Sequence, residues 1–255
     1  MGLELIILII SALMTSAISA VLGMGGGIIL LGIMAIMIPE GYLVIALHGI
    51  IQLFSNSTRT YIFKGHLKKN LISNFFIGAL IGLFASALII YLLMNFLGVQ
   101  SANQIRIDFL KSIIGIFIIW YLYLKPKNKQ GKKMSFIGVG GISGISSIFV
   151  GATGPLIAPF FLSGDLKKEN IIANKAACQV ISHLGKIPIF IFLFGVNYFE
   201  QYEILVPLII AVYVGTYIGK KILSYIPEKT FELIYRVCLT AIAIKLVLDE
   251  LLLIF

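Results

Sequence analysis

The sequence predicts an all-α polytopic membrane protein built as an inverted repeat, in which each half holds three transmembrane helices and one glycine-broken re-entrant hairpin. Three observations predict this fold. Of the 255 residues, 59% are hydrophobic and only 12% are charged, a composition that a soluble domain could not cover with polar surface. A pattern of glycines and polar residues recurs in the two halves of the chain. The lysines gather in loops that this arrangement places on one side of the membrane.

Apolar segments follow one another along the whole chain, and helix is the predicted state of each. A lipid-exposed backbone must satisfy its own hydrogen bonds, which an α-helix does. Most segments approach the roughly 20 residues that cross a hydrocarbon core. No soluble domain is expected between them. The eight segments span about 3–38, 42–63, 71–97, 107–124, 135–162, 170–194, 204–224 and 231–255.

The two halves share three features in the same order, which indicates an internal repeat. Glycine-rich breaks, Gly23–Gly27 and Gly151–Pro155, interrupt the first and fifth segments. Each break is followed by a helix with a polar stripe at positions i, i+4, i+7, i+8 and i+11, and then by a helix with two glycines four residues apart. We therefore divide the chain into an N-terminal repeat (1–124), a basic cytoplasmic linker (125–134) and a C-terminal repeat (135–255). The stripes are His48, Gln52, Ser55, Asn56 and Arg59 in the first half and Lys175, Gln179, Ser182, His183 and Lys186 in the second, and the glycine pairs are Gly78/Gly82 and Gly215/Gly219.

The loop charges decide how many segments cross. If all eight crossed, eight loop lysines would face five lysines and Arg106, which is hardly a bias. If the first and fifth segments turn back at their glycine breaks, thirteen lysines share one side. Cytoplasmic loops carry an excess of Lys and Arg, so six spanning helices and two re-entrant hairpins are predicted. Three spans per half invert the second half relative to the first, a pattern of transporters. The first arm, 3–22, is nevertheless long enough to span by itself.

The glycine breaks are candidate anion sites. Each ends where a short helix begins, near Gly27 and Pro155. The free N–H groups and the positive dipole end at a helix start attract anions. The alternative is that the glycines only permit tight helix packing. On the first interpretation, the breaks contribute Gly25, Gly26, Gly27, Thr153 and Gly154 to a substrate site.

The polar stripes are predicted to face the same site. Each stripe covers about 100° of one helical face. An ionisable group at the membrane centre costs roughly 2.5–3.5 kcal/mol or more, so these residues should face a cavity or a partner. The side chains nearest the helix middles, and therefore the best lining candidates, are Gln52, Asn56, Gln179 and His183.

Three stripe residues bring positive charge. Arg59 and Lys175 lie near the cytoplasmic ends of their helices, so each either reaches the site or extends to the membrane interface. Lys186 lies deeper and has no nearby carboxylate in the sequence, so its counter-charge is expected to be the substrate. For Ser55 and Ser182, hydrogen bonds between helices are favoured over contact with substrate.

Other function classes find little support. The net charge of +9 is explained by the loop lysines, so no nucleic-acid partner is expected. Cys178 and Cys238 both lie in apolar segments and predict neither a disulfide framework nor a metal site. No cofactor is expected. Gly141–Gly144 matches the Gly-x-Ser-Gly pattern of rhomboid intramembrane proteases, with Ser143 as nucleophile and His183 as base, but small residues also pack membrane helices, so an enzyme is not expected.

The two breaks and the stretch Asn174–His183 resemble the two repeats of the TauE/SafE sulfite exporter family over essentially the whole chain. This resemblance implies transport of small sulfur-containing anions or organic acids across a prokaryotic cell membrane. Thiosulfate-importing relatives are associated with cysteines along the path. Here the first-half counterpart of Cys178 is Ile51, which argues against a paired-cysteine relay.

Taken together, these features predict a multi-pass secondary transporter in a prokaryotic plasma membrane, with sulfite or an organosulfonate as its substrate. An anion channel is the competing interpretation within transport. No ATP-binding loop is visible, so an ion gradient or the gradient of the substrate would drive transport. His48 and His183 either carry a coupled proton or form neutral hydrogen bonds between helices. The direction of transport and assembly into a homo-oligomer stay open.

Overall fold

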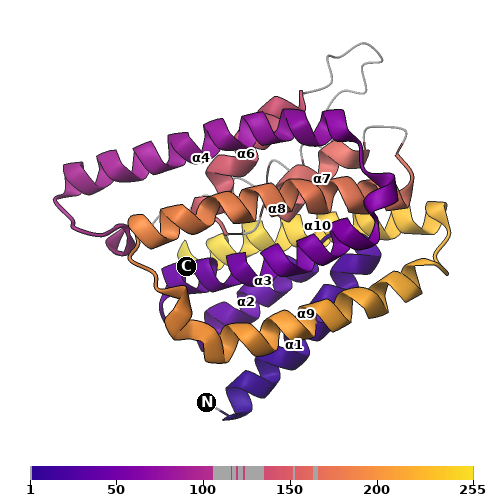
Figure 1. Ribbon diagram of the computed structural model, residues 1–255, viewed down its shortest axis with the longest axis horizontal. Coiled ribbons are helices and arrows are strands. Elements are labelled where there is room, and N and C mark those ends of the chain that lie inside the picture. Colours follow the sequence, from indigo (N-terminus) through magenta and orange to yellow (C-terminus); the bar gives the residue numbers. More distant parts are fainter. Residues whose placement is uncertain are drawn as a thin grey trace.

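The protein is a bundle of α-helices that run along its long axis (Figure 1). A computed structural model describes residues 2–105, 116, 119, 123, 135–151, 153–162 and 166–254. The predicted segment 107–124, apart from three residues, and the linker 125–134 lie outside these residues. The helices are α1 (Gly2–Leu22), α2 (Gly26–Met37), α3 (Gly41–Ile62), α4 (Lys69–Leu97), α6 (Phe136–Phe149), α7 (Gly154–Leu162), α8 (Lys168–Phe192), α9 (Tyr202–Leu223) and α10 (Glu228–Ile254), with short 3-10 turns η1 (Lys64–His66), η2 (Ala102–Gln104) and η4 (Tyr198–Gln201).

Three of these helices are long and apolar enough to cross a membrane by length and composition alone, within the described part of the chain. They are α1, α4 and the continuous helical stretch Tyr198–Leu223 that contains α9. Helices α3 and α8 have 22 and 25 residues but carry the polar stripes. The apolar helices and the length of α1 agree with the sequence analysis, and the protein is a membrane protein.

The connections that follow α3 and α9 meet at one end of the bundle, the right end in Figure 1. Asn174, in α8, accepts a hydrogen bond from the backbone of Lys68 at 2.6 Å and donates one to the His66 carbonyl at 3.0 Å. Lys168, at the start of the same helix, contacts the carboxylate of Glu228 through its backbone N–H at 3.1 Å. At the opposite end, the backbone of Ala102 donates to the Leu193 carbonyl at 3.0 Å.

Each glycine pair brings two helices from different halves into backbone contact. A Cβ atom on Gly78 or Gly82 of α4 would overlap a carbonyl oxygen of α6. A Cβ atom on Gly215 or Gly219 of α9 would likewise overlap a carbonyl oxygen of α1. The close approach predicted from the two pairs is therefore confirmed. In each pair of helices, a contact four residues further along one helix lies four residues further along the other. Helix α6 therefore runs parallel to α4, and α1 runs parallel to α9.

These parallel contacts show at which end of the bundle α1 and α6, the arms before the two breaks, start. Helix α1 starts at the same end as α9, and α2 leads back toward the start of α3 at that end. Helix α6 starts at the end where α4 starts, and α7 returns there: the rings of Phe136 and Phe161 lie 5.4 Å apart. The breaks between the arms use backbone that only glycine adopts readily, with φ of 91° at Gly25 and 79° at Gly151.

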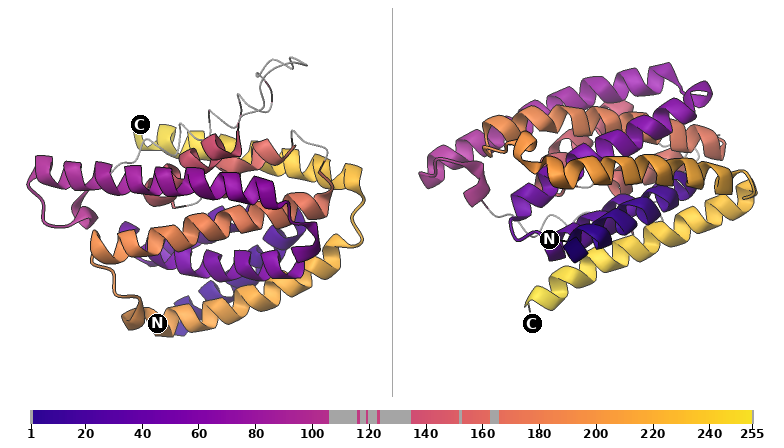
Figure 2. Two further views of the ribbon diagram at one scale, coloured as in Figure 1. Left: turned by 45° about the horizontal axis from the view of Figure 1, so that its top comes forward. Right: turned by 60° about the horizontal axis from the view of Figure 1, so that its bottom comes forward.

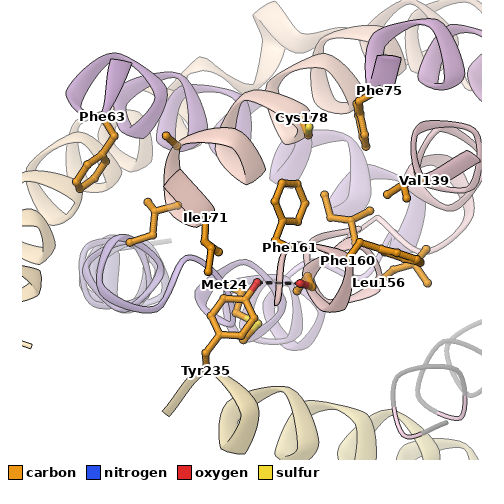
Figure 3. Close-up of a cluster of buried hydrophobic side chains, with 14 of the residues drawn as sticks. Met24, Phe63, Phe75, Val139, Leu156, Phe160, Phe161, Ile171, Cys178 and Tyr235 are labelled. Carbon is orange, nitrogen blue, oxygen red and sulfur yellow. Dashed lines mark hydrogen bonds between the residues drawn. The ribbon is translucent and has the colours of Figure 1, made fainter. Parts of the chain in front are cut away.

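Helix α7 is the most enclosed of these arms. It packs against α6, α8 and α10, and Phe160 and Phe161 belong to the buried apolar cluster shown in Figure 3. The hydroxyl of Tyr235, in α10, donates to the Ala158 carbonyl at 3.3 Å. Helix α10 packs on α1, α7 and α8 and runs along the outside of the bundle (Figure 2). The second break is therefore held by apolar packing on several sides.

Because the loops after α3 and before α8 share one end, cysteines placed in them should report the same side of the membrane. We expect Gly65→Cys and Lys167→Cys, in a background lacking Cys178 and Cys238, to be protected from an impermeant thiol reagent in intact cells.

Glu200→Cys, in η4 at the opposite end, is the matched control and should be labelled. Labelling of position 167 together with protection of position 65 would contradict both the topology and the packing of these loops.

Candidate functional site

A small cavity lies between the two glycine breaks and the polar stripes of α3 and α8. Its volume is about 20 Å³, and roughly 10–15 Å³ is enough for one water molecule. The residues that line it come from both halves: Ser19, Met24, Gly25, Gly27, Ile28, His48, Gln52, Arg59, Gly154, Pro155, Lys175, Gln179 and His183.

The two halves present the same pair of residues to this cavity. A Cβ atom on Gly27 would lie 3.3 Å from the amide carbon and oxygen of Gln52, and one on Gly154 would lie 3.0 Å from Nε2 of Gln179. In each half, therefore, the first turn of the short helix faces the glutamine of the polar stripe. The glutamine lies 25 residues after the glycine in both cases. The starts of both short helices, where backbone N–H groups lack partners within the helix, therefore line the same space.

Three cations are buried around the cavity, with exposed fractions of 0–1%. Lys175 donates to the Gly23 carbonyl at 2.5 Å. Arg59 donates to the Ser19 carbonyl at 3.0 Å and to Oδ1 of Asn56 at 2.6 Å. The third cation is Lys186. Because both side chains are buried inside the protein, neither Arg59 nor Lys175 extends to the membrane interface.

No carboxylate lies near these cations in the part of the chain that the structure describes. Every Asp and Glu whose burial the structure describes is exposed or half-buried, and none lines the cavity. The partners of the buried cations are neutral oxygens. Removing a charge from water without an opposite charge is costly. Among the described residues, the basic side chains here therefore lack a carboxylate partner, an arrangement that an anionic ligand would complete.

Two histidines face each other across the cavity, with ring centroids 6.2 Å apart. Nε2 of His48 donates to the Gly27 carbonyl at 2.8 Å, while its Nδ1 has no partner. Both ring nitrogens of His183 also lack a hydrogen-bond partner, although the residue is only 1% exposed. Buried polar atoms are nearly always paired. Within the described residues, these are thus groups that a ligand could satisfy.

Four predicted site residues do not line the cavity. Asn56 contributes indirectly, since it holds Arg59. A Cβ atom on Gly26 would overlap the Thr15 carbonyl of α1, so this glycine serves the packing within the first hairpin. Thr153 is fully buried and its hydroxyl has no partner. Lys186 donates to two carbonyls, those of Ile45 at 3.2 Å and Gly151 at 3.3 Å.

The structure adds lining residues that the site prediction omitted. His48 occupies the stripe position equivalent to Lys175, so the repeat alone could have included it. Ser19 precedes the first break by one turn, and Met24 and Pro155 lie in the breaks themselves. Nothing in the pattern distinguished these residues from their neighbours.

The stripe serines hold helices together, as expected. Ser55 lies 3.0 Å from Ser16 of α1, and Ser182 lies 3.0 Å from Ser143 of α6, between hydroxyl oxygens in both cases. Each pair is separated by 39 residues, so the same bond occurs at the same place in both halves. Ser143 therefore contacts Ser182, and no hydrogen bond joins it to His183.

Comparison with known families matches residues 8–246 to the family described as Sulfite exporter TauE/SafE. The chain belongs to the TauE/SafE family of sulfite exporters. The match covers nearly all of the chain, including both breaks and both stripes, so the membrane and transporter assignments hold for the protein as a whole. No curated protein and no solved structure gave a match.

Adjacent glycines in the first break offer a test of the site. We expect Gly27→Ala to leave the thermal stability nearly unchanged and to weaken anion binding about tenfold, or ~1.4 kcal/mol, because its Cβ would displace the Gln52 amide. Gly154→Ala, against Gln179, should act alike. Binding titrations and unfolding temperatures of the purified variants measure both effects.

Gly26→Ala is the matched comparison. Its Cβ meets backbone of α1 rather than a flexible side chain, so we expect destabilisation of about 1–3 kcal/mol. Equal loss of stability in Gly26→Ala and Gly27→Ala would mean that Gly27 serves packing alone.

Proposed function

We propose that this protein is a secondary transporter that moves a small anion, sulfite or an organosulfonate, across a prokaryotic plasma membrane through the cavity between the two breaks. The observation that carries this proposal is the buried group of Arg59, Lys175 and Lys186 with no buried carboxylate among the described residues. Such a group is neutralised most simply by the transported anion. The family description, Sulfite exporter TauE/SafE, supports sulfite as the first substrate to test.

Each polar group at the cavity has a role in this proposal. The N–H groups at the starts of α2 and α7, with Gln52 and Gln179, replace part of the hydration of the anion. Arg59 and Lys175 contribute charge-assisted hydrogen bonds. Among the described residues, the two ring nitrogens of His183 have no hydrogen-bond partner, and in this proposal His183 and His48 would carry a coupled proton.

The proposal includes an inverted repeat with two re-entrant hairpins. Its support is the equivalence of contacts: Gly27 faces Gln52 as Gly154 faces Gln179, and Ser16 bonds Ser55 as Ser143 bonds Ser182. The broken arms α1–α2 and α6–α7 start from opposite ends of the bundle (Figure 1). Such a repeat allows two conformations of similar energy that expose one site to alternate sides.

The small cavity favours a carrier over a channel. A volume of about 20 Å³ cannot hold sulfite, so the site must widen during transport. A protein that closes around its site and opens toward one side at a time fits a carrier. A channel would instead need a continuous path, wide enough for the anion, through the whole protein.

Counterflow distinguishes these two alternatives. Proteoliposomes loaded with unlabelled sulfite should transiently accumulate labelled sulfite above its external concentration if the protein is a carrier. A channel would only equilibrate the label. Absence of any sulfite, sulfonate or small carboxylate movement would contradict the proposed function.

Lys175 should contribute strongly to substrate binding. We expect Lys175→Met to weaken sulfite binding by about 10- to 100-fold, since hydrogen bonds to charged groups contribute roughly 1.5–3 kcal/mol. The exposed Lys167, on the preceding loop, provides the control: Lys167→Met should bind and transport as the parent does. Titration of purified proteins measures the difference, and equal affinity of Lys175→Met and the parent would remove Lys175 from the site.

A further inference from the structure

A second and larger cavity lies at the end of the bundle away from the lysine-rich loops. Its volume is about 590 Å³, and Ile45, Val150 and Phe190 are among the residues that line it. Glu40 and Asn103, which are exposed, also line it. We call it the outer vestibule. It is large enough for a hydrated anion. The cavity of about 20 Å³ between the two breaks, which we call the central cavity, is not.

Lys186 occupies the layer between the two cavities. On α3, Ile45 lines the vestibule and His48, one turn further, lines the central cavity. On α8, Phe190 lines the vestibule and His183 lines the central cavity, with Lys186 one turn from each. Lys186 itself lines neither cavity and is fully buried.

The ammonium of Lys186 joins three parts of the molecule at this layer. From α8 it donates to the Ile45 carbonyl of α3 and to the Gly151 carbonyl of the second break. Its side chain crosses α3 at Gly49, where a Cβ atom would overlap Cε of Lys186. A glycine in the middle of a 22-residue helix is otherwise unfavourable, so the passage of the lysine gives it a structural reason.

We propose that Lys186 holds an outer gate closed: by tying α3 and the second break to α8, it separates the outer vestibule from the central cavity. This inference rests on the proposed function, because an anion arriving from the vestibule would take the place of the two carbonyls and release them. Pro188, inside α8 and two residues beyond Lys186, lacks the N–H that would support the helix, so the part of α8 beyond it can tilt at this point.

The gate can be tested without measuring transport. In a background with Cys178→Ala and Cys238→Ala, Gln52→Cys places a thiol in the central cavity, which the Lys186 layer separates from the outer vestibule. The probe is an anionic, membrane-impermeant methanethiosulfonate added to intact cells. We expect slow modification with Lys186 present and modification at least tenfold faster in Lys186→Met. Gly49→Ala, which displaces the lysine by a different route, should also accelerate it.

Three controls make the result decisive. Gly41→Ala, whose Cβ meets nothing within 4 Å, should leave the rate unchanged. Asn103→Cys should be modified rapidly in every background; if it is not, the vestibule faces the other side and the reagent is added to inside-out vesicles. Ser86→Cys, fully buried between α4 and α6, should stay unmodified.

Unchanged modification of Gln52→Cys in both Lys186→Met and Gly49→Ala overturns the gate, and so does acceleration that Ser86→Cys shares. If only one variant folds, its rate decides. The gate and the proposed function fail separately: faster modification without anion transport would keep the gate, and transport without faster modification would remove it.

Discussion

The structure depends on how it holds positive charge away from water. Arg59, Lys175 and Lys186 are buried, and their hydrogen-bond partners are neutral oxygens of the breaks, of neighbouring helix backbone and of Asn56. An ammonium or guanidinium in such surroundings keeps only part of its solvation. Carbonyl dipoles lower this cost but bring no opposite charge, and in the proposed function the transported anion supplies it.

The glycines are what allow the charges to reach these carbonyls. Gly78, Gly82, Gly215 and Gly219 bring α4 onto α6 and α9 onto α1 at backbone distance, and residues of both breaks line one cavity. Gly25 and Gly151 then adopt positive φ, so the chain can end one helix and begin another inside the bundle. Backbone that is not helical survives at this depth because it is enclosed by protein. The same glycines therefore serve both the helix packing and the shape of the site.

The sequence predicted the parts of the site that follow from periodicity. The stripe spacing placed Gln52, Gln179 and His183 on inward faces, and the glycine pairs identified the closest helix contacts. The sequence could not predict how deeply each side chain is buried or which residues of other helices it contacts. Burial of Arg59 depends on the carbonyl of Ser19, which is 40 residues away.

The sequence also could not predict how far along the helix axis, relative to the cavity, each stripe residue lies. Lys186 and Arg59 hold equivalent places in the repeat, yet only Arg59 lines the central cavity. Gly26 and Gly27 are indistinguishable in a run of three glycines, yet one faces α1 and the other faces Gln52. Such differences arise from tertiary contacts, which a single helical period does not encode.

Thermal stability of the purified protein in different anions tests the central claim most directly. Unfolding is followed at constant ionic strength, balanced with gluconate, while sulfite, sulfate or chloride is titrated against neutral dimethyl sulfone. A bound anion stabilises the folded state by about 2.7 kcal/mol at a concentration of 100 times its Kd. The account predicts a saturable rise in unfolding temperature with sulfite and none with the neutral sulfone. Equal shifts with both, or no saturable shift with any small anion, would contradict it.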